Sequence, residues 1–163
     1  MWIAGIDVST KAVDLALIHQ DNLQPPKWHH YPLTGHDAWE RTRSIPYAMP
    51  GPHSTFWDTV AAIGMENPAG THGAHAVQRA VGAVLACLPP LALVQPWRPS
   101  EWRKACAMPG NASKGHVRAA AMDDVMLIHG YQAWMDEWPQ DAWDAHCVAI
   151  ATRNAIEHKE ADE

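Results

Sequence analysis

Four acidic residues lie where an isolated carboxylate would be costly or where two carboxylates meet. Asp7 interrupts the apolar N-terminal stretch MWIAGIDVSTKAVDLALI, and Glu66 ends the apolar run TVAAIGME. Asp141 and Asp144 are three residues apart in QDAWDAHCVAIA, so a helix would project both from the same side. A buried, ionised carboxylate needs a cation, hydrogen-bond donors, or a position at the open end of a strand. The four acids are therefore candidates for one shared site.

A divalent metal is the natural partner for such a set. Converging carboxylates repel one another and raise each other's pKa values unless a cation holds them. Oxygen ligands suit Mg²⁺ or Mn²⁺, and a pair of such ions serves phosphoryl transfer. We therefore expect two Mg²⁺ ions, with Mn²⁺ able to substitute. For Asp141 and Asp144 the alternative is solvated acids that the dipole of a helix N-terminus favours.

The elements that must position these acids follow from hydrophobic spacing and turn residues. Strands are predicted over 1–8, 12–18, 27–33, 59–66 and 91–97, the first two forming a hairpin with its turn at 9–11. Helices are predicted over 36–44, 69–88, 99–107, 113–129 and from Pro139 onward, and a surface loop over 45–59. Strands followed by alternating strands and helices indicate an α/β domain, a mixed sheet flanked by helices. A length of 163 residues with 47% hydrophobic content fits one domain.

Composition limits the classes of partner. The net charge of −6 argues against unspecific nucleic-acid binding, which depends on Lys and Arg. Residues 97–118 nevertheless hold five basic side chains against one acid, Glu101, so a local basic surface is expected; they are Arg98, Arg103, Lys104, Lys114 and Arg118. The three cysteines form no CxxC pair and are predicted to be buried hydrophobes. No membrane span or signal peptide is evident, so we expect a cytoplasmic protein.

The order of these motifs resembles a known family. GID in the first strand, an acid after a central apolar strand, the G-x-x-x-K segment GNASK and a final DAWDA helix resemble the RuvC-type Holliday junction resolvases of the RNase H-like superfamily. The resemblance spans nearly the whole chain. It implies an RNase H-like domain over 1–158, with a mixed five-stranded sheet, followed by an acidic tail over 159–163.

The resemblance also implies roles for particular residues. Asp7, Glu66, Asp141 and Asp144 match the family's catalytic metal ligands. Lys114 matches a lysine at the rim of the active site, and Arg103 a second basic position. Such a cation neutralises the scissile phosphate or the charge of the transition state; the alternative for Lys114 is an ordinary lysine at a helix start.

The chain departs from the family pattern at two points. Val8 and Ser9 follow the first acid where members commonly have Pro-Gly, and ENPAGTHGAH after the second acid lacks the aromatic residue of many bacterial members. Trp97 or Trp102 in the basic stretch could stack on DNA bases, although tryptophan more often packs in a core. Trp134, Trp138 and Trp143 are predicted to be packing residues.

The sequence thus predicts an endonuclease that resolves four-way DNA junctions by paired symmetric nicks, in bacterial or phage-infected host cytoplasm. Two symmetric cuts require two active sites, so a homodimer is expected, with the apolar faces of helices within 70–88 and 114–129 as candidate contacts. A broader flap or fork nuclease would use the same acids. An actin-like or sugar-kinase-type ATP-binding protein is suggested by GIDVST, and a DNA-binding module without catalysis is the third alternative.

Overall fold

The computed structural model of the protein describes residues 1–67 and 74–162. Its centre is a mixed sheet in the order β3-β2-β1-β4-β5, which confirms the predicted five-stranded sheet. Neighbours β1–β2 and β2–β3 are antiparallel, whereas β1–β4 and β4–β5 are parallel. The strands are β1 (Trp2–Val8), β2 (Ala12–His19), β3 (Lys27–Pro32), β4 (Val60–Glu66) and β5 (Val94–Trp97).

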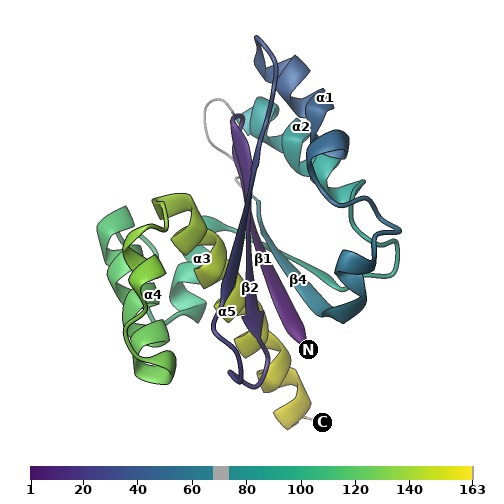
Figure 1. Ribbon diagram of the computed structural model, residues 1–163. Coiled ribbons are helices and arrows are strands. Elements are labelled where there is room, and N and C mark those ends of the chain that lie inside the picture. The colour runs from purple at the N-terminus through teal and green to yellow at the C-terminus, as the bar shows by residue number, and fades with distance from the viewer. Residues whose placement is uncertain (68–73, 163) are drawn as a thin grey trace.

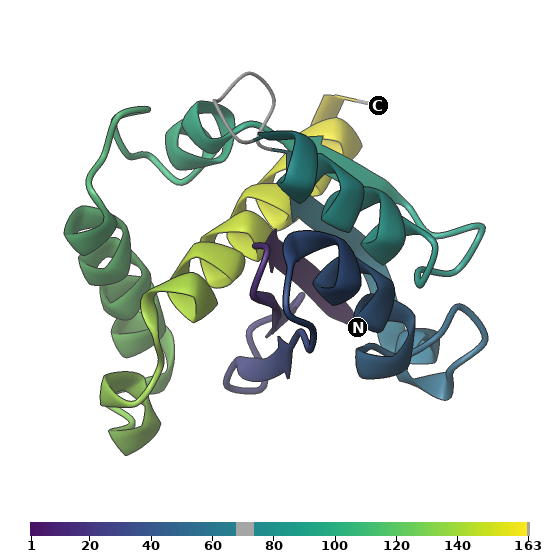
Figure 2. The same ribbon diagram turned by 90° about the horizontal axis from the view of Figure 1, so that it is seen from above.

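Helices cover both faces of this sheet. α1 (Ala38–Ala48) and α2 (Ala74–Leu85) lie on one face, and α5 (Gln140–Asp162) crosses the other (Figures 1 and 2). α3 (Pro99–Ala105) and α4 (Lys114–His129) pack against α5 on its side of the sheet. Two short 3₁₀ helices, Thr55–Thr59 and Ala133–Asp136, complete the elements. In the part of the chain that the structure describes, no helix combines the length and hydrophobicity that a membrane crossing requires.

The two faces of β1 belong to two different cores. Trp2, Ala4 and Ile6 pack with residues of α1 and α2 in the first core. Alternate residues point the other way, so Gly5 and Asp7 face α5. The second core joins α3, α4 and α5 around Trp102, and it includes the predicted packing residues, since Trp138 and Trp143 are buried and Trp134 packs on them.

Several predicted boundaries are corrected by the structure. α1 continues through Pro46 to Ala48, where a loop was predicted. Proline removes one hydrogen bond from the last turn, but the fully buried Ile45 anchors that turn in the core, and Met49 N–H donates to the Ile45 carbonyl at 3.0 Å. β5 begins at Val94 rather than at residue 91, because Ala92 N–H closes a turn onto the Pro89 carbonyl at 3.0 Å.

Helices α2 and α5 differ in extent from the helices predicted there. α2 is described from Ala74, and the predicted helix residues 69–73 lie outside the described ranges. α5 extends to Asp162, so helix includes most of the segment predicted as an acidic tail. The cysteines are free, with Cys87 and Cys147 buried as expected and Cys106 half-buried.

Candidate metal centre and active site

Three of the four predicted acids come together at one end of the sheet. Asp7 lies next to the end of β1 on the face that α5 covers, and Asp141 and Asp144 lie in the first two turns of α5. One ligand oxygen from each of the three lies within 4.8 Å of the others. The approach is possible because Gly5 has no side chain: a Cβ there would lie under 3.0 Å from the Ala145 carbonyl and from Ala149. Close packing of helix on strand thus assembles the carboxylates.

Glu66 stands beside this group rather than in it. It ends β4, the parallel neighbour of β1, and its Oε2 accepts a hydrogen bond from Trp102 Nε1 at 2.8 Å. Trp102 is completely buried, so the prediction that it stacks on DNA bases is wrong. Trp97 is half-buried, packs on the second core and donates from Nε1 to Thr152 Oγ1 at 2.9 Å, which makes it a packing residue as well. The sequence contained no spacing that pairs residue 102 with residue 66.

The electrostatics of the site oppose ionisation of the acids. Burial raises the pKa of Asp7 well above its ordinary value, and the charges of Glu66, Asp144 and Asp141 raise it further. Burial also raises the pKa of Glu66 and of Asp144. A bound divalent cation would offset both the burial and the repulsion, and carboxylate oxygens are the ligands that Mg²⁺, Mn²⁺ and Ca²⁺ prefer. The donor set therefore fits a hard metal ion.

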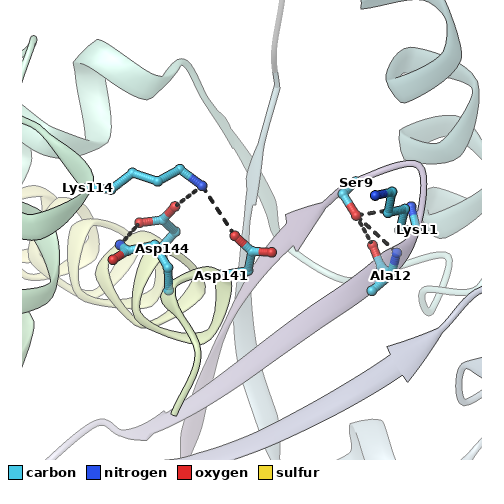
Figure 3. Close-up of polar contacts among 7 residues, drawn as sticks. Ser9, Lys11, Ala12, Lys114, Asp141 and Asp144 are labelled. Carbon is cyan, nitrogen blue, oxygen red and sulfur yellow. Dashed lines mark hydrogen bonds and ion pairs between the residues drawn. The ribbon is translucent and has the colours of Figure 1, made fainter. Parts of the chain in front are cut away.

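Lys114 lies at the rim of this cluster. Ser113 caps α4 by accepting the His116 N–H, which places Lys114 at the first helical position. Its Nζ lies 3.4 Å from Asp141 Oδ1 and 3.9 Å from Asp144 Oδ2 (Figure 3). Burial acts to lower the pKa of Lys114, but the charges of Asp141 and Asp144 outweigh it and raise that pKa. The side chain is therefore a cation in contact with the acids.

The other predicted basic residues line α3 and α4. Arg103 lies over the Trp102 ring at 4.9 Å and donates to the Gly110 carbonyl at 3.3 Å. Its charge acts to lower the pKa of Glu66 and of Asp144, so it lies near the cluster. Arg98 and Lys104 are exposed, and Arg118 is half-buried in α4.

The turn after Asp7 is closed by a serine. Ser9 Oγ accepts from the N–H groups of Lys11 and Ala12 and donates to the Ala12 carbonyl (Figure 3). Serine thus supplies through its side chain the hydrogen bonds that close the β1–β2 turn. The β1–β2 hairpin therefore forms with Val8 and Ser9 directly after Asp7.

Sequence reasoning missed one acid, Asp14. It lies in β2 directly opposite Asp7 and is only 3% exposed. Its Oδ1 is 2.9 Å from Trp28 Nε1 and 2.9 Å from His30 Nδ1, both on β3. The sequence does mark Asp14 as a candidate buried acid, because it interrupts the apolar run AVDLALI as Asp7 interrupts the run before it.

No protein-family model and no curated protein sequence matches the chain. Among solved structures, Thermus thermophilus RuvC superposes with a TM-score of 0.68 at 20% identity, over 98% of this chain and 97% of that one. T. thermophilus RuvC in complex with a Holliday junction substrate gives 0.68 at 18% identity, over 97% and 96%. The fowlpox virus Holliday junction resolvase aligns over both full chains at 15% identity with a TM-score of 0.43. The superpositions on RuvC show that this chain has the RNase H-like fold of RuvC.

Proposed function

We propose that this protein is a metal-dependent endonuclease that resolves four-way DNA junctions by paired symmetric nicks. The observation that carries the proposal is the convergence of Asp7, Asp141 and Asp144, with Lys114 at their rim, on a fold shared with RuvC over nearly the whole chain. One of the superposed RuvC structures holds a Holliday junction substrate. The same full-length match disfavours the actin-like or sugar-kinase alternative.

The roles of the residues follow from their positions. Asp7, Asp141 and Asp144 would hold the metal, and Glu66 would add the carboxylate oxygen that Trp102 does not occupy. Two Mg²⁺ ions, or Mn²⁺ in their place, would supply activation of a water and stabilisation of the leaving oxygen. Lys114 neutralises charge on the scissile phosphate. The flanking phosphates are contacted by Arg98, Arg103, Lys104 and Arg118, each of which would release counterions from the DNA.

Homodimerisation belongs to the same proposal, because one active site per chain must cut two strands symmetrically. Exposed apolar side chains are available on both helices expected to make the contact: Leu85 on α2, and Met126, Leu127 and Ile128 on α4. Sedimentation or light scattering should give twice the mass of one chain. A chain that cuts junctions in pairs while monomeric would overturn this part of the proposal.

The decisive experiment compares cleavage of a labelled immobile four-way junction with that of a flap and a plain duplex. Reactions contain Mg²⁺, Mn²⁺, Ca²⁺ or EDTA. We expect paired nicks on the junction with Mg²⁺ or Mn²⁺, poor cutting with Ca²⁺, whose coordination is looser, and none with EDTA. Equal cutting of the flap would support the broader branched-DNA nuclease, and no cutting with any metal would overturn both.

A matched pair of variants assigns the activity to the site. Asp7→Asn should abolish cleavage while junction binding persists, because a carboxylate facing phosphate is removed without a change of shape. Asp123→Asn makes the same chemical change at an exposed position of α4 and should cut normally. An Asp7→Asn variant that cuts at the wild-type rate would remove Asp7 from the site.

A further inference from the structure

A buried carboxylate outside the proposed metal ligands lies beside the site. Asp14 on β2 is the register partner of Asp7, so the two side chains lie on the same face of the sheet. His30 on β3 is in turn the register partner of Asp14. Asp7, Asp14 and His30 therefore form one row across three neighbouring strands, on the face that α5 covers. The proposed chemistry uses only the first of them.

The row is held rigidly. Asp14 Oδ1 contacts both Trp28 Nε1 and His30 Nδ1, each at 2.9 Å. The Trp28 ring also packs against the His30 ring, with centroids 5.7 Å apart, and against Trp138 of the second core at 6.1 Å. The orientation of His30 is thus set by a buried acid and by an indole anchored in the core.

His30 is partly open to solvent. The side chain is 44% exposed although Asp14 is buried behind it. Nδ1 is engaged by Asp14, and among the described residues Nε2 makes no hydrogen bond, so a doubly protonated ring would donate from Nε2 to an anion. Within residues 1–67 and 74–162, the only cluster of three or more candidate metal ligands is Asp7, Asp141 and Asp144, and neither Asp14 nor His30 belongs to it.

We propose that His30 contacts a backbone phosphate of the bound DNA, on the β3 side of the acid cluster. The inference rests on the proposed nuclease function. Arg103 lies with Glu66 and Trp102 on the β4–β5 side of Asp7, and the sheet order puts His30 on the other side. A DNA strand that crosses a cluster of acids is repelled there, so cationic contacts on both sides hold it in place.

The spacing agrees with such a contact. Two strand separations of about 4.8 Å put His30 about 10 Å across the sheet from Asp7. At a rise of about 3.4 Å per nucleotide along the axis of a DNA helix, that distance corresponds to about three nucleotides from the cut. Lys27 begins β3 at the end away from Asp14 and lies over the ring of Trp2 at 4.3 Å, and Trp2 belongs to the core on the opposite face of the sheet.

The first test measures junction binding in Ca²⁺ at about pH 6 over a series of salt concentrations. Each phosphate contact contributes about 0.7 to 0.9 to the slope of log association constant against log salt. His30→Ala should reduce the slope by that amount. His29→Ala is the matched control, because His29 directly precedes His30 in β3 but points to the opposite face, edge-on to Phe56. The slope of this variant should equal the wild-type slope.

The second test locates the contact. Single phosphates of the junction are replaced by neutral methylphosphonates, one position at a time. Wild-type affinity should fall at a phosphate a few nucleotides from the cut, and His30→Ala should be insensitive at that position alone. Should His30→Ala prove unstable in thermal melting, His30→Gln keeps a donor toward Asp14 but carries no charge, and the same insensitivity is expected.

The outcomes separate the two proposals. Wild-type protein that neither binds nor cuts junctions overturns the nuclease function and this inference with it. Wild-type protein that cuts, together with a His30→Ala variant whose salt slope and methylphosphonate pattern equal those of wild type, overturns the role of His30 alone.

Discussion

The substitution Gly5→Ala tests how the fold brings the acids together. Gly5 lies two residues before Asp7 on β1, directly under α5. An alanine Cβ at this position would lie 2.9 Å from the Ala149 Cβ and closer still to backbone atoms of Ala145 and Ala149. A backbone cannot rotate aside as a flexible side chain can, so the helix as a whole must move.

The size of the effect follows from these contacts. Ordinary van der Waals contact begins near 3.4 Å, so α5 must withdraw from β1 by at least 0.5 Å for the Ala149 Cβ and by more for the backbone atoms. Overpacking of this kind costs about 1–3 kcal/mol of folding free energy. Asp141 and Asp144 move with α5, and a misplacement of about 1 Å in a catalytic site can cost about 100-fold in rate.

Urea denaturation measures the loss of folding free energy, and junction cleavage measures the loss of rate. Mn²⁺-dependent thermal stabilisation measures how well the displaced carboxylates still bind metal. Gly82→Ala is the control, because a Cβ at Gly82 meets nothing within 4 Å. There alanine should stabilise α2 by about 0.5–1 kcal/mol and leave cleavage unchanged. A Gly5→Ala protein with wild-type stability, metal response and cleavage would refute the argument that close packing of α5 on β1 assembles the site.

Three further outcomes are expected. In EDTA, the raised pKa of Asp7 means that the folded state binds more protons than the unfolded state above pH 3.8, so stability falls as pH rises toward the folded-state pKa. At neutral pH, the urea midpoint of unfolding should therefore be higher for Asp7→Asn than for wild type, and this difference should shrink as the pH is lowered. Equal urea midpoints at every pH would contradict the expectation. Trp102→Phe removes the donor to Glu66 and should weaken Mn²⁺ binding measured by calorimetry, whereas Trp39→Phe, at an exposed site, should not. Lys114→Gln should slow cleavage while Mn²⁺ binding persists, since Lys114 neutralises phosphate rather than holding metal, and lost metal binding would assign it a different role.

Most of the fold followed from short-range patterns in the chain. Apolar runs bounded by polar or turn residues predicted the β1–β2 hairpin and β4, and helix-start signals at Ser113 and Pro139 predicted α4 and α5, because such signals act over a few neighbouring residues. The predicted end of α1 was too early, because the burial of Ile45 outweighs the tendency of Pro46 to end a helix. Burial depends on residues distant in sequence.

The candidate site was likewise predictable in part from the sequence. An acid within an apolar strand and a pair of acids three residues apart identified Asp7, Asp141 and Asp144, because the cost of burying charge is visible in the chain itself. The hydrogen bond from Trp102 to Glu66 and the contacts of Trp28 and His30 with Asp14 join residues 14 to 36 positions apart. Those pairings arise from strand register and from the packing of α3, and no spacing along the chain encodes them.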